Sequence, residues 1–232
     1  MSNSVAAHAA VRKSTWLAAV LIVGATGANA STLEFDFNAE FSGGQAPGGV
    51  APWITATITD ITSGAHAGSV ELTISTANLL SNENVSEADF NILPSLNSQL
   101  SNLVFTPVSG VAASAINTGV DAFKADGDGK YDIQFMYPGG SGFDKQLTSS
   151  YYISDPGSVL TVADFDTLSA PMGGHGPFLT AAHIQNTTGA CGSSGCTGSG
   201  WVAPVPLPAA AWLLLSGLGG LAAFARRTRH HA

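Results

Sequence analysis

Three aspartates in a short glycine-containing segment are the residues of this sequence best suited to bind a metal. Asp126, Asp128 and Asp132 lie in the segment KADGDGKYD, which starts at Lys124. Where glycine bends a loop, carboxylates at alternate positions can converge as the oxygen ligands that Ca²⁺ prefers. However, Lys124 and Lys130 stand in ligand positions, and the glutamate that closes many calcium loops is missing. The segment predicts either a weak Ca²⁺ site or, as we favour, a β-turn formed by the two Asp-Gly pairs.

The two cysteines of the chain, Cys191 and Cys196, predict a disulfide bond. Two of the four residues between them are glycines, and such a segment can curl enough to bring the two sulfur atoms together. The ring is small, so we expect the bond to add little to stability. The alternative is a zinc site in which His175 and His183 join the two thiolates, although this combination has no recognised ligand spacing.

Other residue types give weaker indications of function. The chain has no Gly-x-Ser-x-Gly motif, and a pair of acids carries no weight where 16 acidic residues are present. We therefore expect a protein that is not an enzyme, with a hydrolase as the least favoured alternative. The rings of Trp53, Tyr151, Tyr152 and Trp201 could stack on sugars, although strand aromatics more often pack in a core. A carbohydrate-binding module is the alternative function that these residues leave open.

The elements that must position these residues are short strands. Residues 33–41 alternate between apolar and polar side chains, as do residues 70–74 and 131–137, which is typical of half-buried strands. Residues 81–89 are polar and resemble a turn, and no long helical period appears before Pro204. We expect residues 31–188 to form one antiparallel β-sandwich, jelly-roll-like in topology, followed by a Gly/Ser-rich linker over residues 189–203.

The charge of residues 31–203 limits the partners of this part of the chain. It keeps three lysines, no arginine and all 16 acidic residues, which is a net charge of −13. Nucleic acids and anionic lipid surfaces both require basic residues for binding. We therefore expect no nucleic acid as a partner.

The N-terminus has the features of a signal peptide over residues 1–30. Arg12 and Lys13 precede a short apolar run at residues 16–23, and Ala28-Asn29-Ala30 fits the small-residue pattern of a cleavage site. The apolar run is too short to span a membrane comfortably. We expect cleavage between Ala30 and Ser31.

The C-terminal tail, residues 204–232, combines three features in a fixed order. A proline motif comes first, an uncharged apolar run over residues 207–225 follows, and an arginine cluster ends the chain. Nineteen helical residues rising about 1.5 Å each just span a hydrocarbon core about 30 Å thick. Because arginines remain on the cytoplasmic side, this transmembrane helix would hold the rest of the chain outside. The residues of the motif and the cluster are Val205, Pro206, Leu207, Pro208, Arg226, Arg227 and Arg229.

This tail resembles the PEP-CTERM sorting signal, with Leu207 where many members have glutamate. The segments FKADGDGKYDIQF, GGHGPF and GSGW are also similar to parts of other PEP-CTERM proteins. The resemblance implies export in a Gram-negative bacterium that makes exopolysaccharide, and processing near the proline motif by an exosortase.

The resemblance also implies a role and a location for the protein. It implies a non-enzymatic protein of the envelope or of the biofilm matrix. The protein would be anchored in the inner membrane with its body in the periplasm, and would reach the cell surface or the medium after processing. The expected partners are an exosortase-like enzyme, the membrane and, as a candidate, an extracellular polysaccharide. We expect no cofactor apart from the weak Ca²⁺ alternative.

Overall fold

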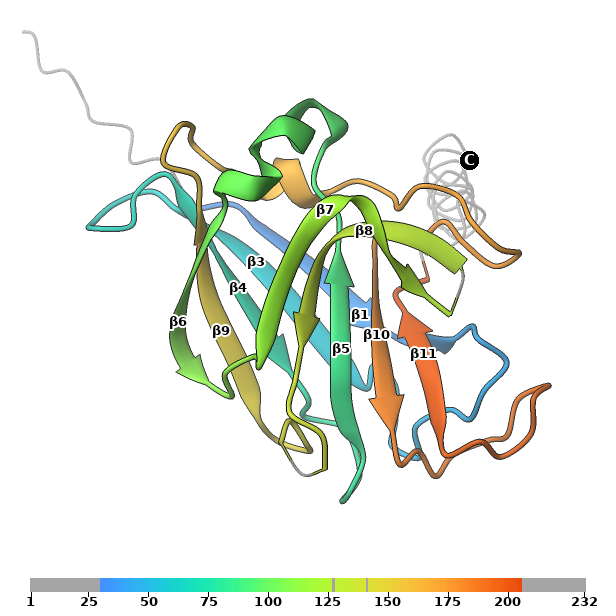
Figure 1. Cartoon of the computed structure of the whole chain (residues 1–232). Coiled ribbons are helices and arrows are strands. Elements are labelled where there is room, and N and C mark those ends of the chain that lie inside the picture. Colours follow the sequence, from blue (N-terminus) through green and yellow to red (C-terminus); the bar gives the residue numbers. More distant parts are fainter. Residues whose placement is uncertain (1–29, 127, 141, 206–232) are drawn as a thin grey trace, which may run out of the picture.

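Two antiparallel β-sheets that pack face to face make up most of the computed structural model, which describes residues 30–126, 128–140 and 142–205 (Figure 1). The prediction of a mainly β fold with antiparallel sheets is confirmed. The jelly-roll-like topology stays a prediction. The signal sequence, the proline motif from Pro206 onward and the expected helix over residues 207–225 lie outside the described residues. Among the residues that are described, no helix has the length and apolar character needed to cross a membrane.

The first sheet has five strands in the order β1-β3-β4-β9-β6. Their bounds are Thr32–Phe37 for β1, Ile54–Ile61 for β3, Ser69–Ser75 for β4, Thr148–Ser154 for β9 and Val104–Gly110 for β6. The alternation seen in the sequence directs one side of each inner strand into the core. In β3, for example, Ile54 and Ile58 are buried, whereas Thr55 and Thr57 are more exposed.

The second sheet has six strands in the order β2-β11-β10-β5-β8-β7. Their bounds are Ala39–Glu40 for β2, Ser199–Ala203 for β11, Thr180–Gln185 for β10, Asn84–Phe90 for β5, Asp128–Met136 for β8 and Ala115–Ala125 for β7. Two 3₁₀-helices, η1 at Pro94–Asn102 and η2 at Val162–Phe165, connect strands of the two sheets.

Aromatic rings fill the space between the sheets. Phe135 of β8 is fully buried and makes edge-to-face contacts with Phe90, Phe105 and Tyr151, at centroid distances of 5.9, 5.6 and 5.4 Å. Phe105 and Tyr151 belong to the first sheet, and Phe90 belongs to the second. Phe135 therefore joins the two layers through contacts in the geometry that aromatic pairs favour.

A second, smaller apolar cluster covers part of the outer face of the second sheet. Ala181 belongs to this cluster, whereas its neighbour Ala182 belongs to the main core, and successive strand residues point to opposite faces. The cluster consists of Phe41, Ala125, Tyr131, Phe178, Ala181 and Ala203. The strands β7 and β8 bend across this side of the molecule (Figure 1), with an irregularity in their pairing between Thr118 and Phe123. This cover buries side chains that would otherwise face water.

Two segments differ from the sequence expectations. Residues 84–89 of the polar stretch expected to be a turn belong to the central strand β5, because Val85, Ala88 and the following Phe90 supply enough apolar surface for the core. The linker expected over residues 189–203 contains β11, which pairs with β10 and β2. Glycine and serine dominate this segment and obscure the short strand, so the domain boundary at residue 188 is placed too early.

Candidate functional site beside the disulfide loop

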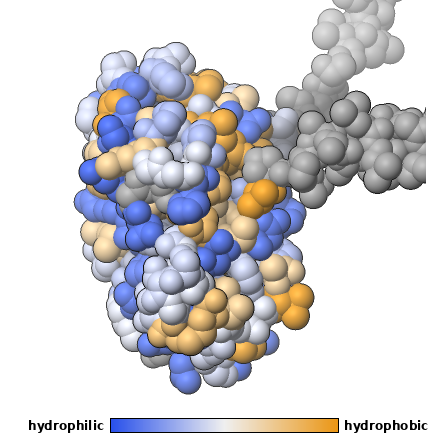
Figure 2. Space-filling view, turned by 90° about the vertical axis from the view of Figure 1, so that its right-hand side faces the viewer, coloured by the Kyte–Doolittle hydropathy of each residue, from blue (hydrophilic) through white to orange (hydrophobic). Residues whose placement is uncertain are grey.

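A pocket of about 210 Å³ lies between β11, β10 and the loop that carries the two cysteines. Four segments that are distant in sequence build its wall. The lining residues are Ser42, Gly44, Asp126, His183, Ser194, Thr197, Ser199, Gly200 and Trp201. On the side of the molecule where β11 lies, hydrophilic and hydrophobic residues are interspersed (Figure 2). Hydropathy alone therefore does not mark this pocket as a binding site.

The aromatic part of the wall is a stacked pair of rings. His183 and Trp201 are directly opposite in the pairing of β10 with β11, and their rings stack at 5.0 Å between centroids and 25° between planes. Nδ1 of His183 lies 2.9 Å from the hydroxyl of Ser86. Burial lowers the pKa of His183, although the charge of Asp126 acts in the opposite direction. The imidazole is therefore uncharged at neutral pH and can exchange hydrogen bonds with a neutral ligand.

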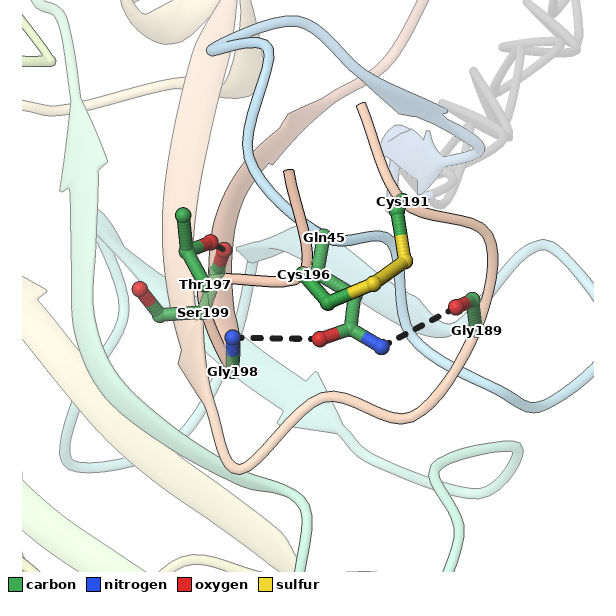
Figure 3. The surroundings of a disulfide bond; sticks show 7 residues. All are labelled: Gln45, Gly189, Cys191, Cys196, Thr197, Gly198 and Ser199. Atoms are coloured by element: carbon green, nitrogen blue, oxygen red, sulfur yellow. Dashed lines mark hydrogen bonds between the residues drawn. A yellow bond between two sulfur atoms is a disulfide. The ribbon is translucent and has the colours of Figure 1, made fainter. Parts of the chain in front are cut away.

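The disulfide loop forms the opposite part of the wall. Cys191 and Cys196 are joined by a disulfide bond. The side chain of Gln45 holds both ends of the loop, because its Nε2 donates to the carbonyl of Gly189 at 3.1 Å and its Oε1 accepts from the N–H of Gly198 at 3.1 Å (Figure 3). The loop is thus fixed to the segment that contains Gln45. The position of the loop in turn sets the positions of Ser194 and Thr197 at the pocket.

Backbone hydrogen bonds add to this anchoring. The N–H groups of Gly192 and Ser194 donate to the carbonyls of Gly44 and Gly43, each at 2.7 Å. The chains approach so closely here that a Cβ on Gly200 would lie 2.6 Å from the carbonyl oxygen of Gln45. Close packing therefore favours glycine at position 200, because a larger residue would collide with the backbone of Gln45.

The carboxylate of Glu40 supports the floor of the pocket. It accepts hydrogen bonds from the N–H groups of Ser42 at 2.8 Å and Gly44 at 3.1 Å, and it also contacts the hydroxyl of Ser42. That hydroxyl in turn accepts from the N–H of Trp201 at 3.2 Å. The sequence analysis did not single out Glu40 and Gln45, because this part of the chain reaches the pocket through the pairing of β2 with β11.

The predicted metal residues do not line one pocket. Asp126 lies beside His183, whereas Asp132 lines a separate pocket with Asp121 and accepts hydrogen bonds from the N–H groups of Ile92 at 3.2 Å and Asp121 at 2.8 Å. Burial raises the pKa of Asp132. The side chain of Asp128 lies outside the described residues. The segment forms the tip of the β7–β8 hairpin, and the described side chains contain no group of three or more His, Cys, Asp and Glu arranged for a metal.

The alternative of a zinc site lacks its two thiolate ligands, because the sulfur atoms of Cys191 and Cys196 are bonded to each other. A disulfide sulfur is not the thiolate ligand that zinc requires. His183 stacks on Trp201 instead. The interpretation of His175 and His183 as zinc ligands together with Cys191 and Cys196 is therefore wrong for this structure.

The four aromatic residues considered for sugar binding lie in different places. Trp53 is buried and donates its indole N–H to the carbonyl of Gly49 at 2.8 Å. Tyr151 is buried in the core, and the next residue of β9, Tyr152, points to the other face and stacks on His66. Trp201 alone among these four belongs to the pocket beside the disulfide loop.

A pair of acids on β5, the buried Asp89 and the half-buried Glu87, is a further feature that the sequence did not reveal. Asp89 is fully buried, and no described N–H or hydroxyl donates to its carboxylate oxygens, so the carboxyl group of Glu87 is its hydrogen-bonding neighbour. Burial, and then the charge of Glu87, raise the pKa of Asp89 well above its usual value. Burial also raises the pKa of Glu87. Asp89 has no exposed surface through which to reach a substrate. The raised pKa values instead make the pair a source of pH-dependent stability.

Comparisons with protein families, with curated proteins and with solved structures find no match for this chain.

Proposed function

We propose that this chain is an exported, non-enzymatic protein of the cell envelope or extracellular matrix, processed by an exosortase-type enzyme in a bacterium that makes exopolysaccharide. The observation that carries the proposal is the ordered tail of proline motif, apolar run and arginine cluster. The end of the folded body supports it. The last strand, β11, ends at Ala203, and Val205, the first residue of the motif, donates its N–H to Oδ1 of Asn38 at 3.1 Å.

The N-terminal end fits export in the same way. Ala30 and Ser31 are exposed, and β1 begins at Thr32, directly after the expected cleavage site. The carbonyl of Ser31 accepts a hydrogen bond from the N–H of Asp60 at 2.9 Å. Removal of residues 1–30 would leave this first contact of the fold in place.

In this proposal the signal peptide directs the chain across the inner membrane, and residues 207–225 stop its transfer as a transmembrane helix. Arg226, Arg227 and Arg229 resist crossing, so the body stays in the periplasm until processing. The prolines of the motif interrupt regular backbone at the outer surface, which leaves the segment accessible to a cutting enzyme. The processed body then reaches the cell surface or the medium.

The test compares the mature protein in cells with and without an active exosortase, by fractionation and mass spectrometry. Replacing the three arginines with glutamate should weaken retention and sorting while the body stays folded. Replacing Pro206 and Pro208 with alanine should slow cutting with insertion unchanged, which makes it the matched control for anchoring. A native protein that keeps its complete tail in cells with an active exosortase would show an ordinary single-span membrane protein instead.

A further inference from the structure

The pocket between the disulfide loop and the His183–Trp201 pair has the chemical character of a sugar site. One part of its wall is aromatic, and the remainder presents hydroxyl and backbone groups from Ser42, Ser194 and Thr197. Sugar rings combine apolar C–H faces with hydroxyls around their edge, so they fit an aromatic surface bordered by polar groups. Ligand sites in general join apolar or aromatic walls to a few fixed polar groups.

The charges around the pocket restrict the kind of sugar. Among the described residues, no lysine or arginine lines it, and its charged lining group is the carboxylate of Asp126. A second carboxylate, that of Glu40, lies directly behind Ser42. An acidic sugar, a phosphate or a sulfate would approach negative charge without a cation to pair with it. A neutral sugar can instead donate hydroxyl hydrogens to Asp126, and hydrogen bonds to a charged acceptor are the stronger kind.

The size of the pocket restricts the length of the ligand. A volume of about 210 Å³ is below the range of roughly 300–1,000 Å³ that is usual for sites of drug-sized molecules. It accommodates one sugar unit rather than several. The anchoring of the disulfide loop by Gln45 and by backbone hydrogen bonds fixes this shape before a ligand arrives, which lowers the ordering cost of binding.

We propose that this pocket binds one neutral sugar unit, at the end or along the side of a polysaccharide, with the His183–Trp201 pair against the sugar ring and Asp126 accepting from its hydroxyls. The inference goes beyond the proposed function, because a sorted envelope protein does not require a glycan ligand. It also does not depend on the tail, since every group that it uses belongs to the folded body.

The experiment measures binding of the full chain, purified in mild detergent, to immobilised glycans. The probes are neutral polysaccharides (a glucan, a galactan and a mannan) and a polyuronate of similar length. We expect binding to at least one neutral glycan and none to the polyuronate. Asp126→Asn should weaken binding about tenfold, from the loss of a charged acceptor. This variant should fold normally, because Asp126 is exposed and has φ 48°, a conformation that asparagine tolerates.

A second variant and a control complete the design. Trp201→Ala should also weaken binding about tenfold or more. Tyr152→Ala is the matched control, because Tyr152 is an aromatic residue stacked on a histidine as Trp201 is, but on the other sheet. Equal loss in Tyr152→Ala, equal binding of the polyuronate, or no binding to any neutral glycan would each overturn the inference. None of these results bears on tail processing, whose failure shows separately as an uncut tail in cells.

Discussion

Replacing Asp89 with asparagine should stabilise the protein at neutral pH and flatten the dependence of its stability on pH. Asp89 is opposite Gln134 of β8 and Ala181 of β10 in the middle of the second sheet, and its side chain is fully buried. Burial and the nearby Glu87 raise its pKa well above the usual value. Asparagine has nearly the same shape and no charge, so the substitution removes the proton equilibrium and keeps the packing.

The sign follows from comparing the folded and unfolded chains. An unfolded aspartate loses its proton near pH 3.9, whereas folded Asp89 still holds it there. Above that pH the folded state binds more protons, so the free energy of unfolding falls as pH rises, until the folded pKa is passed. One proton corresponds to a slope of about 1.4 kcal/mol per pH unit. The raised pKa of Glu87 contributes in the same direction, and the lowered pKa of His183 contributes in the opposite direction below about pH 6.5.

Urea unfolding followed by circular dichroism, at several pH values from about 4.5 upward, measures this effect. Subtracting the curve of Asp89→Asn from that of the wild type largely removes the contribution of His183. The difference should change by about 1.4 kcal/mol per pH unit just above the pKa of the unfolded residue. Asp36→Asn is the control, since Asp36 is an exposed acid on β1. Parallel curves for the wild type and Asp89→Asn, which differ by no more than a constant offset, would refute the reasoning.

Two substitutions test the core and the loop. Phe135→Ala removes a fully buried ring that contacts three other rings in both sheets, and should lower the free energy of unfolding by about 3–5 kcal/mol, measured from urea midpoints; a loss below about 1 kcal/mol would mean that the two layers do not meet there. Replacing Cys191 and Cys196 together with serine should cost at most about 2 kcal/mol, the chain entropy of so small a ring. Hydrogen exchange should then rise in the loop and stay unchanged in the core strands, and a general loss of protection would contradict this.

Strands with one buried face were predictable from the sequence, because the core imposes its alternation on their side chains. Leu33, Phe35 and Phe37 in β1 and Ile133 and Phe135 in β8 follow this pattern. The edge strand β7 gave no such signal, since most of its residues are exposed or half-exposed on both sides. In β5, the acids Glu87 and Asp89 alternate with the core residues Ala88 and Phe90, and Asp89 is nevertheless fully buried. Such burial arises from tertiary structure, and a local pattern does not reveal it.

The pocket was predictable in part. The cysteine pair and Trp201 were singled out by residue type. Asp126 was named as a calcium ligand together with Asp132, which lines another pocket, and His183 as a zinc ligand together with the two cysteines, which form a disulfide. Spacing along the chain misled here because the true neighbours come from different segments. Gly43 and Ser194, for example, meet in a backbone hydrogen bond beside the pairing of β2 with β11. Residues that come together from separate segments in this way do not form a recognisable sequence motif.

The position of β11 also predicts where the mature chain ends. Val202 and Ala203 are fully buried, and this strand is paired on both sides, by β10 and by β2. A processing enzyme needs accessible, extended backbone, and residues held in the middle of a sheet do not offer it. Val205 is 45% exposed, so accessibility begins two residues after the strand.

We therefore expect a processed form to end at Val205 or beyond it, within the proline motif. Such a cut would leave β11 in the sheet and Trp201 in the pocket, so processing and glycan binding would be compatible in the same molecule. C-terminal peptide mapping of the mature protein by mass spectrometry measures this directly. A mature chain that ends before Ser199 would lack the strand and the aromatic pair. That result would contradict both the accessibility argument and any glycan-binding role for the processed form.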